Sequence, residues 1–376
     1  MGNPLRLAIP VMTQYEGEIK AFLAAKKRLE EASAGTKLPL EVGVFLYYTD
    51  KAITPEVRVK QRANQRLYKL PIFHAQAPIY QHNSLAFAEE EAARFPDRAS
   101  MLEATIEQAA WMRDLGPQTP FSEALSVETH PGVIVYPDFN PSDPTDTNRP
   151  STYSIQDFLE KRDRLLEIMK ARYAALKERG ALEGVAFGIE NCHAVVLEPD
   201  RWAGNKPRFN YTPFGDIASL RHMAGVSPEN AEQGRYLVFD IAHQATARDA
   251  PDAFRRNDTP KNLAHLLNIY DVQTPEEFLR RFGDIPTKLG DANTIQLSNV
   301  TGLGVHLGAT PELEKRWGKD GTFKGVLTRD EMRGAIEHAR AHGIPLALEL
   351  DYDIKKIPTN QFVEVDKFLA SLYRDE

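Results

Sequence analysis

The chain has 376 residues, 42% of them hydrophobic and 26% charged, so it is long and apolar enough to bury a sizeable core. It carries 46 Lys and Arg against 53 Asp and Glu, and the net charge of -7 argues against nucleic acid as a partner because it repels phosphate. A disordered chain and a nucleic-acid-binding protein are both disfavoured.

The cysteine content and the apolar segments indicate the cellular setting. The single cysteine, Cys192, can form no internal disulfide and no cysteine-based zinc or iron-sulfur site. The first residues lack a basic region followed by a long apolar core. No segment reaches the roughly 18 uninterrupted apolar residues of a membrane span. We therefore expect an unprocessed cytoplasmic protein without a membrane partner.

Short apolar runs recur along the chain, and most precede a longer charge-rich stretch with apolar residues three and four apart, as in a helix. In chain order the predicted strands are 5 to 10, 40 to 48, 69 to 79, 132 to 137, 184 to 190, 234 to 240, 294 to 299 and 344 to 351. The predicted helices are 19 to 32, 54 to 68, 100 to 116, 154 to 180 and 327 to 343. This alternation favours a parallel sheet.

Eight strand and helix units fit the length of a (β/α)8 barrel. We therefore predict an α/β fold in which residues 1 to 376 form one (β/α)8 TIM-barrel domain. The polar stretches 137 to 154 and 198 to 216 follow strands and should be long loops on its C-terminal face. A doubly wound open sheet would usually carry a Gly-rich phosphate turn after an early strand, and this sequence has none there.

In such a barrel, the residues at the C-terminal ends of the strands meet at a central mouth. Glu190, Asp240, Gln296 and Glu349 lie at or near the ends of four successive predicted strands. Three carboxylates and an amide oxygen suit a hard divalent cation such as Mg²⁺ or Mn²⁺, and without a cation the carboxylates would repel one another. The alternative for each acid is a loop cap or a pair with an arginine.

Further polar residues near the strand ends are candidates for substrate binding. His243 follows Asp240 by three residues, so one turn could present both side chains to the same site. The remaining candidates are His306, His74, Tyr136 and His193. Each has an ordinary structural role as its alternative.

Four segments together resemble the xylose isomerase-like TIM-barrel superfamily. They are GIEN (188 to 191), VFDIAH (238 to 243), TIQLSNVTGLGVHLG (294 to 308) and ALELD (347 to 351). The resemblance implies one divalent metal ion held by Glu190, Asp240, Gln296 and Glu349, with Glu190 and Glu349 also moving protons. Gln296 departs from the family, which usually has a histidine there.

The same superfamily includes the endonuclease IV group. A resemblance to that group would imply a three-zinc site with further histidine ligands. Here the third predicted strand offers His74 or Gln76, and the fourth offers Tyr136 where a histidine would be expected. A three-zinc site is therefore expected to be incomplete.

The sequence leads to one main functional hypothesis and two alternatives. The main one is an isomerase or epimerase, or a related dehydratase, acting on a sugar or keto-polyol with Mn²⁺ or Mg²⁺ foremost and Co²⁺ or Zn²⁺ as further options. Alternatives are a barrel that has lost its metal and binds ligands or works without metal, and a zinc-dependent endonuclease. A homo-oligomer is expected by analogy.

Overall fold

A computed structural model shows how the predicted elements assemble. It describes residues 3–36, 38–46, 54–77, 101–117, 125–130, 155–192, 194–198, 208–211, 214–226, 236–256, 260–282, 292–297, 299–300, 306–307, 327–348 and 365.

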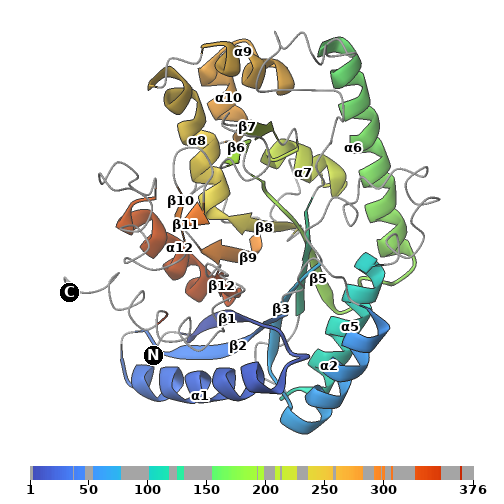
Figure 1. Ribbon diagram of the computed structural model, residues 1–376, viewed down its shortest axis with the longest axis vertical. Helices are drawn as coiled ribbons and strands as arrows, with labels where there is room; N and C mark the ends of the chain where they lie inside the picture. Colours follow the sequence, from blue (N-terminus) through green and yellow to red (C-terminus); the bar gives the residue numbers. More distant parts are fainter. Residues whose placement is uncertain are drawn as a thin grey trace.

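A closed barrel of parallel strands forms the centre of the molecule (Figure 1). Around the barrel the order is β1, β2, β3, β4, β5, β8, β9 and β12, and β12 pairs again with β1. The strands are β1 Leu5–Val11, β2 Leu40–Leu46, β3 Ile72–Gln76, β4 Leu125–Thr129, β5 Val185–Glu190, β8 Leu237–Asp240, β9 Ala292–Leu297 and β12 Leu346–Leu348. The predicted α/β barrel is confirmed.

The alternation of side chains along each strand divides the core into two layers. On β1, Leu5, Leu7 and Ile9 belong to the large cluster between the strands and the helices. Ala8 points the other way, into a small cluster with Phe45, Phe73 and Ala347 inside the barrel. Gly43 leaves room for this inner layer, because a Cβ there would lie 2.5 Å from the Phe73 ring. The two phenylalanine rings therefore fill most of the space that this small cluster occupies inside the barrel.

The five predicted helices are present with small shifts at their ends. They are α1 Glu16–Ser33, α2 Pro55–Tyr68, α5 Met101–Leu115, α6 Ile155–Glu178 and α12 Arg329–His342. Their boundaries follow from capping chemistry: Thr54 caps α2, with Pro55 in its first turn, and Thr328 forms a capping box with Glu331 at the start of α12. Gly343, with φ of 64°, ends α12 in the left-handed conformation.

A second apolar cluster lies beyond β8, where the sequence pattern predicted no helices. The elements there are α8 Ile241–Arg256, α9 Pro260–Ile269 and α10 Pro275–Phe282. Phe254, Tyr270, Phe278 and Phe282 are among its buried members, and Tyr270 meets Phe278 edge to face. These helices form the upper part of Figure 1, near α7 Ile217–Met223.

The fourth strand was placed too late in the sequence. The barrel uses Leu125–Thr129 as β4, and the predicted run 132 to 137 lies outside the described residues. Ser126 and Glu128 face the interior, where they contact His74, so β4 is buried on both faces without being continuously apolar. Because the inward-facing residues of this short strand are polar, β4 is not a continuous apolar run and was not recognised as a strand from the sequence.

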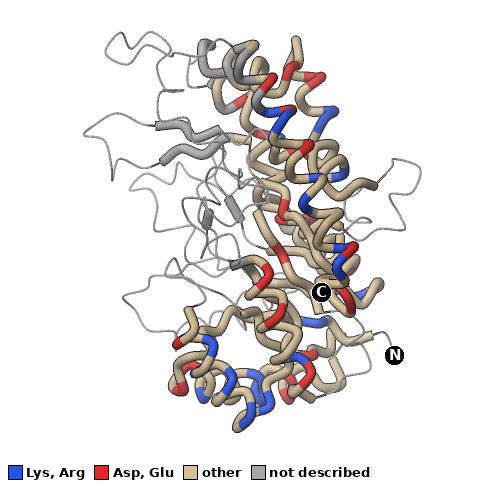
Figure 2. The backbone as a smooth tube through the Cα atoms, turned by 90° about the vertical axis from the view of Figure 1, so that its right-hand side faces the viewer, with Lys and Arg blue, Asp and Glu red and all other residues tan. Residues whose placement is uncertain are grey.

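Two hairpins accompany the barrel: β6 Val195–Glu198 with β7 Arg208–Tyr211, and β10 Asn299–Val300 with β11 His306–Leu307. The predicted loop 137 to 154 lies outside the described residues, as does much of 198 to 216. Within the part of the chain that is described, no helix combines the length and apolar character needed to cross a membrane. Basic and acidic residues are interspersed along the described helices (Figure 2).

Candidate functional site

Glu190 lies at the centre of a buried polar cluster at the C-terminal ends of the strands. It ends β5, and its side chain is fully buried between two histidines. His130 Nε2 lies 2.6 Å from Glu190 Oε2, and His243 Nδ1 lies 3.2 Å from Oε1. Burial alone would raise the pKa of Glu190, but attraction and hydrogen bonding from His130, and then from His243, hold it well below its usual range. The carboxylate is therefore ionised.

Asp240 and His243 form the second part of the cluster, at the start of α8. Asp240 Oδ1 accepts hydrogen bonds from the backbone N–H groups of Ala242 at 2.6 Å and His243 at 2.9 Å, which caps the helix. Asp240 Oδ2 lies 3.5 Å from His243 Nδ1. Burial lowers the pKa of His243, but attraction from Asp240, with a hydrogen bond and attraction from Glu190, raises it to about 10.

Asn191, the last residue of GIEN, holds Asp240 and His243 in position through hydrogen bonds. Its side-chain amide donates to the backbone carbonyl of Asp240 at 2.9 Å and accepts from the Asp240 N–H at 2.7 Å. The Asn191 carbonyl lies 2.7 Å from His243 Nδ1. One residue therefore fixes the ends of β5 and β8 relative to each other and orients the His243 ring. The sequence reading assigned it no role.

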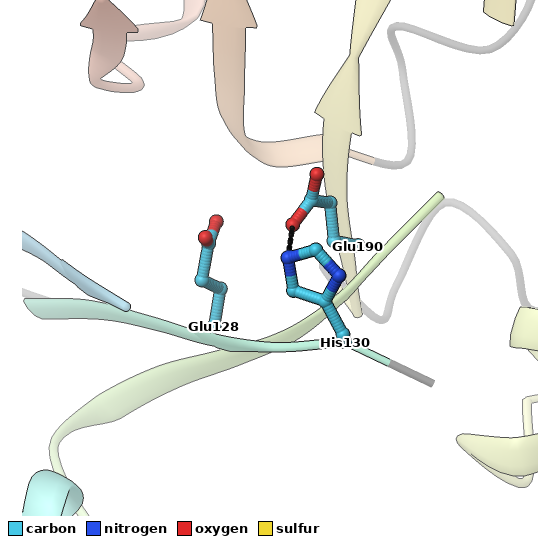
Figure 3. Close-up of side chains that lie close together, drawn as sticks. All are labelled: Glu128, His130 and Glu190. Atoms are coloured by element: carbon cyan, nitrogen blue, oxygen red, sulfur yellow. Dashed lines mark ion pairs between the residues drawn. The ribbon is translucent and has the colours of Figure 1, made fainter. Parts of the chain in front are cut away.

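His130 and Glu128 are the functional candidates that the misplaced fourth strand concealed. His130 directly follows β4 and therefore occupies the strand-end position at which the sequence pattern had placed Tyr136; Tyr136 itself lies outside the described residues. Ser126, Glu128 and His130 alternate in the stretch LSVETH, and this period of two was the signal that could have identified them. Figure 3 shows Glu128, His130 and Glu190 close together, with the His130–Glu190 ion pair dashed.

The remaining nitrogen of His130 faces a thiol. Cys192 Sγ lies 3.7 Å from His130 Nδ1, and the cysteine is buried two residues after Glu190. Gln76 Nε2 approaches His130 Nε2 at 3.5 Å from β3. The ring is thus held between β3, β4 and the segment after β5, and this arrangement turns its Nε2 toward Glu190.

Gln296 on β9 is the register partner of Asp240 on β8. Its Nε2 donates to both oxygens of Glu128, at 2.9 and 2.8 Å. His74 Nε2 lies 2.9 Å from the same carboxylate, and His74 Nδ1 lies 3.1 Å from Ser126 Oγ. His74 therefore supports Glu128 from inside the barrel wall, a geometry better suited to that role than to the predicted substrate contact.

The other predicted site residues are less fully defined by the structure. Glu349, Tyr136 and His193 lie outside the described residues, and their roles remain predictions. His306 starts β11, but its side chain is outside the description.

The residues of the cluster fit a divalent cation. Two groups have ligand atoms that all lie within 4.8 Å of one another, and they share Glu190: Glu128, His130 and Glu190, and Glu190, Asp240 and His243. Apart from the histidine ion pairs of Glu190, its two oxygens and the side-chain oxygens of Gln76 and Gln296 are buried and accept no hydrogen bond from the described residues. Carboxylate, imidazole and amide oxygen together are a donor set for Mn²⁺, Co²⁺ or Zn²⁺.

His74 makes stability depend on pH. Burial lowers its pKa from 6.5 to about 3, so the ring is neutral in the folded protein and protonates more readily in the unfolded chain. Because the unfolded state then binds the extra proton, the free energy of unfolding should fall as the pH drops from 6.5 toward 3, by about 1.4 kcal/mol per unit. Urea unfolding of the wild type and His74→Gln across this range should show a shallower dependence in the variant. Equal slopes would contradict the assignment.

Comparison with known proteins gives structural likeness only. No family model matches the chain, and no curated protein matches it in sequence. A D-tagatose 3-epimerase-like protein aligns over 98% of this chain and 99% of its own, with 14% identity and a TM-score of 0.46. For 3-keto-D-glucoside 4-epimerase from E. coli the values are 98%, 98%, 12% and 0.42.

A protein from Thermus thermophilus, whose crystal was soaked with zinc chloride, aligns over 99% of this chain and 98% of its own. It is 16% identical, with a TM-score of 0.43. Another similar structure is a fusion protein named for a xylose isomerase-like TIM barrel and 4-hydroxyphenylpyruvate dioxygenase, which aligns over 96% of this chain and 41% of its own with 13% identity and a TM-score of 0.40. The function proposed below is based on the side chains of the site.

Proposed function

We propose that this chain is a divalent-metal-dependent isomerase or epimerase, or a related dehydratase, acting on a sugar or keto-polyol through carboxylate-mediated proton transfer. The observation that carries the proposal is Glu190, a fully buried ionised carboxylate between two histidines at the mouth of a closed barrel. Such a group has few structural uses, and perturbed carboxylates of this kind cluster at functional sites.

Glu190, Asp240 and Gln296 would hold the metal ion together with the predicted ligand Glu349. A bound divalent ion supplies polarisation of a substrate carbonyl and its neighbouring hydroxyl, which acidifies the intervening C–H. Mn²⁺ and Mg²⁺ are the first choices, with Co²⁺ and Zn²⁺ as further options, because oxygen ligands predominate in this set.

The residues of the chain itself perform the proton transfer. Glu190 is ionised and accepts a proton from the substrate carbon, while Glu349, the second predicted proton carrier, returns one. His243 carries a positive charge beside Glu190 and Asp240 and can donate a hydrogen bond to a substrate oxygen. Burial of the cluster excludes water, which strengthens these interactions.

The test has two parts, both on the full chain. The protein is dialysed in turn against Mn²⁺, Mg²⁺, Co²⁺ and Zn²⁺, and its metal content is compared with that of Glu349→Gln. It is then incubated in D₂O with a panel of ketoses and keto-inositols, and deuterium incorporation beside the carbonyl is followed by NMR. We expect about one metal equivalent, weakened in the variant, and incorporation with at least one compound. A protein without metal and without exchange would refute the proposal.

His130 favours a second candidate, a metal-dependent phosphodiesterase. With Glu128 and Glu190 it forms a second group with ligand spacing, at a strand that had been expected to lack a histidine. Two or three bound zinc ions together with cleavage of a phosphodiester would select this function over the isomerase. The net charge of -7 favours a small substrate.

A further inference from the structure

The amide of Gln296 has its orientation set by Glu128. The Gln296 Nε2 lies 2.9 and 2.8 Å from the two carboxylate oxygens of Glu128. Both carboxylate oxygens accept hydrogen bonds from Nε2, so the NH₂ end of the amide faces Glu128. The oxygen Oε1 is thereby turned away from Glu128, and it is buried without a hydrogen-bond partner among the described residues.

Glu128 is in turn held in place by His74 on the neighbouring strand β3. His74 Nε2 lies 2.9 Å from Glu128 Oε2, and Ser126 Oγ lies 3.1 Å from the other ring nitrogen. Burial lowers the pKa of His74 to about 3, so the imidazole is a neutral donor. Thr294 Oγ1 donates to Ser126 Oγ at 2.5 Å, which ties this support back to the strand that carries Gln296. Glu128 therefore has little freedom to rotate.

We propose that Glu128 is a positioning residue that makes the oxygen of Gln296, and not its NH₂ group, the strand-β9 ligand of the metal site. The inference rests on the proposed function, because it requires a metal ion beside Asp240, the register partner of Gln296. Metal-bound histidines commonly donate their second N–H to a carboxylate, which fixes the ring. Gln296 offers both ends of such an arrangement, with its NH₂ group on Glu128 and a buried oxygen that has no hydrogen-bond partner among the described residues.

The contacts of Glu128 distinguish positioning from direct ligation. Both of its oxygens already accept N–H bonds from Gln296, and Oε2 also lies 2.9 Å from His74 Nε2. In Figure 3 the dashed ion pair joins His130 to Glu190, and none is drawn to Glu128. Glu128 thus accepts the hydrogen bonds of the Gln296 NH₂ group, and the amide oxygen remains available to bind the ion.

The test compares metal affinities of the full chain by calorimetric titration of the chelator-treated protein with Mn²⁺. The variants are Glu128→Gln, the exchange Glu128→Gln/Gln296→Glu, and the control Glu30→Gln. Glu30 accepts a bond from Val42 N–H near the start of β2, far from the strand ends that carry the site. We expect Glu128→Gln to bind Mn²⁺ about 10- to 100-fold more weakly, because two facing amides no longer select the oxygen. The exchange should restore or exceed wild-type affinity, and the control should match it.

The outcomes separate this inference from the proposed function. If the wild type binds no metal, the proposed function fails and the inference fails with it. If the wild type binds Mn²⁺ and Glu128→Gln binds it equally well, only the inference is overturned. A weakened single variant with no recovery in the exchange also overturns it, because Glu128 then ligates directly or acts through the fold. If circular dichroism shows that Glu128→Gln is unfolded, the exchange variant decides alone: wild-type affinity supports the inference, and lost affinity overturns it.

Discussion

Replacement of Glu190 by glutamine should abolish proton exchange and weaken metal binding by more than about 100-fold, beyond the usual loss for a residue outside the ligand shell. The substitution keeps the shape of the side chain but removes the charge that His130 and His243 share. It also removes the base that the proposed reaction needs. Mn²⁺ titration and NMR-detected deuterium incorporation measure the two effects separately.

The control for this variant is Glu183→Gln. Glu183 lies two residues before β5, at the end of the strand opposite Glu190, and is exposed. Loss of an exposed carboxylate there should leave metal affinity and exchange unchanged. Metal binding in Glu190→Gln at the wild-type level would show that Glu190 is no ligand, and it would leave the metal-free alternative as the better hypothesis.

Replacement of Gly215 by alanine should cost about 1 to 3 kcal/mol of unfolding free energy or more, and it should also weaken metal binding. A Cβ at this position would lie 2.2 Å from the backbone carbonyl oxygen of Cys192, which cannot rotate away as a side chain could. Cys192 is two residues from Glu190 and contacts His130, so a shift of this backbone reaches the site.

The next residue prevents Gly215 from moving away. Asp216 caps α7 by accepting from Ser219 N–H at 3.0 Å, and its Oδ1 lies 3.1 Å from Arg281 Nε. Urea unfolding and Mn²⁺ titration of Gly215→Ala should be compared with Gly334→Ala in α12, where a Cβ meets nothing within 4 Å. The control should gain up to about 1 kcal/mol from helix propensity. If Gly215→Ala left the free energy of unfolding and the Mn²⁺ affinity unchanged, the backbone around Gly215 would have to accommodate the added Cβ without cost.

Most of the barrel could be predicted because its strands are buried on both faces. The pattern of β5 and β8 is apolar until the last residue, so the strands and their terminal acids Glu190 and Asp240 were identified together. β4 was missed because Ser126 and Glu128 fill its inner face, and a nearby apolar run at 132 to 137 was the stronger signal. The error hid His130, which follows β4.

The hydrogen-bond partners of the site residues could not be predicted from the sequence. Glu128 and Gln296 are 168 residues apart, and only closure of the barrel brings them together. The pairing of the neighbouring strands β4 and β5 places His130 against Glu190 and the Cys192 thiol against His130. No spacing rule within one strand predicts such pairs, because they depend on register across the sheet.

The sequence by itself determined the alternation of strand and helix, the fold class and the acids that end β5 and β8. These features depend on local periodicity and on the burial of apolar side chains, which each segment carries on its own. The tertiary structure alone decided which polar groups share the site, which of them are charged, and which end of the Gln296 amide faces Glu128. Burial and the partners brought by other strands set these properties, since a charge or an amide orientation is defined by its surroundings.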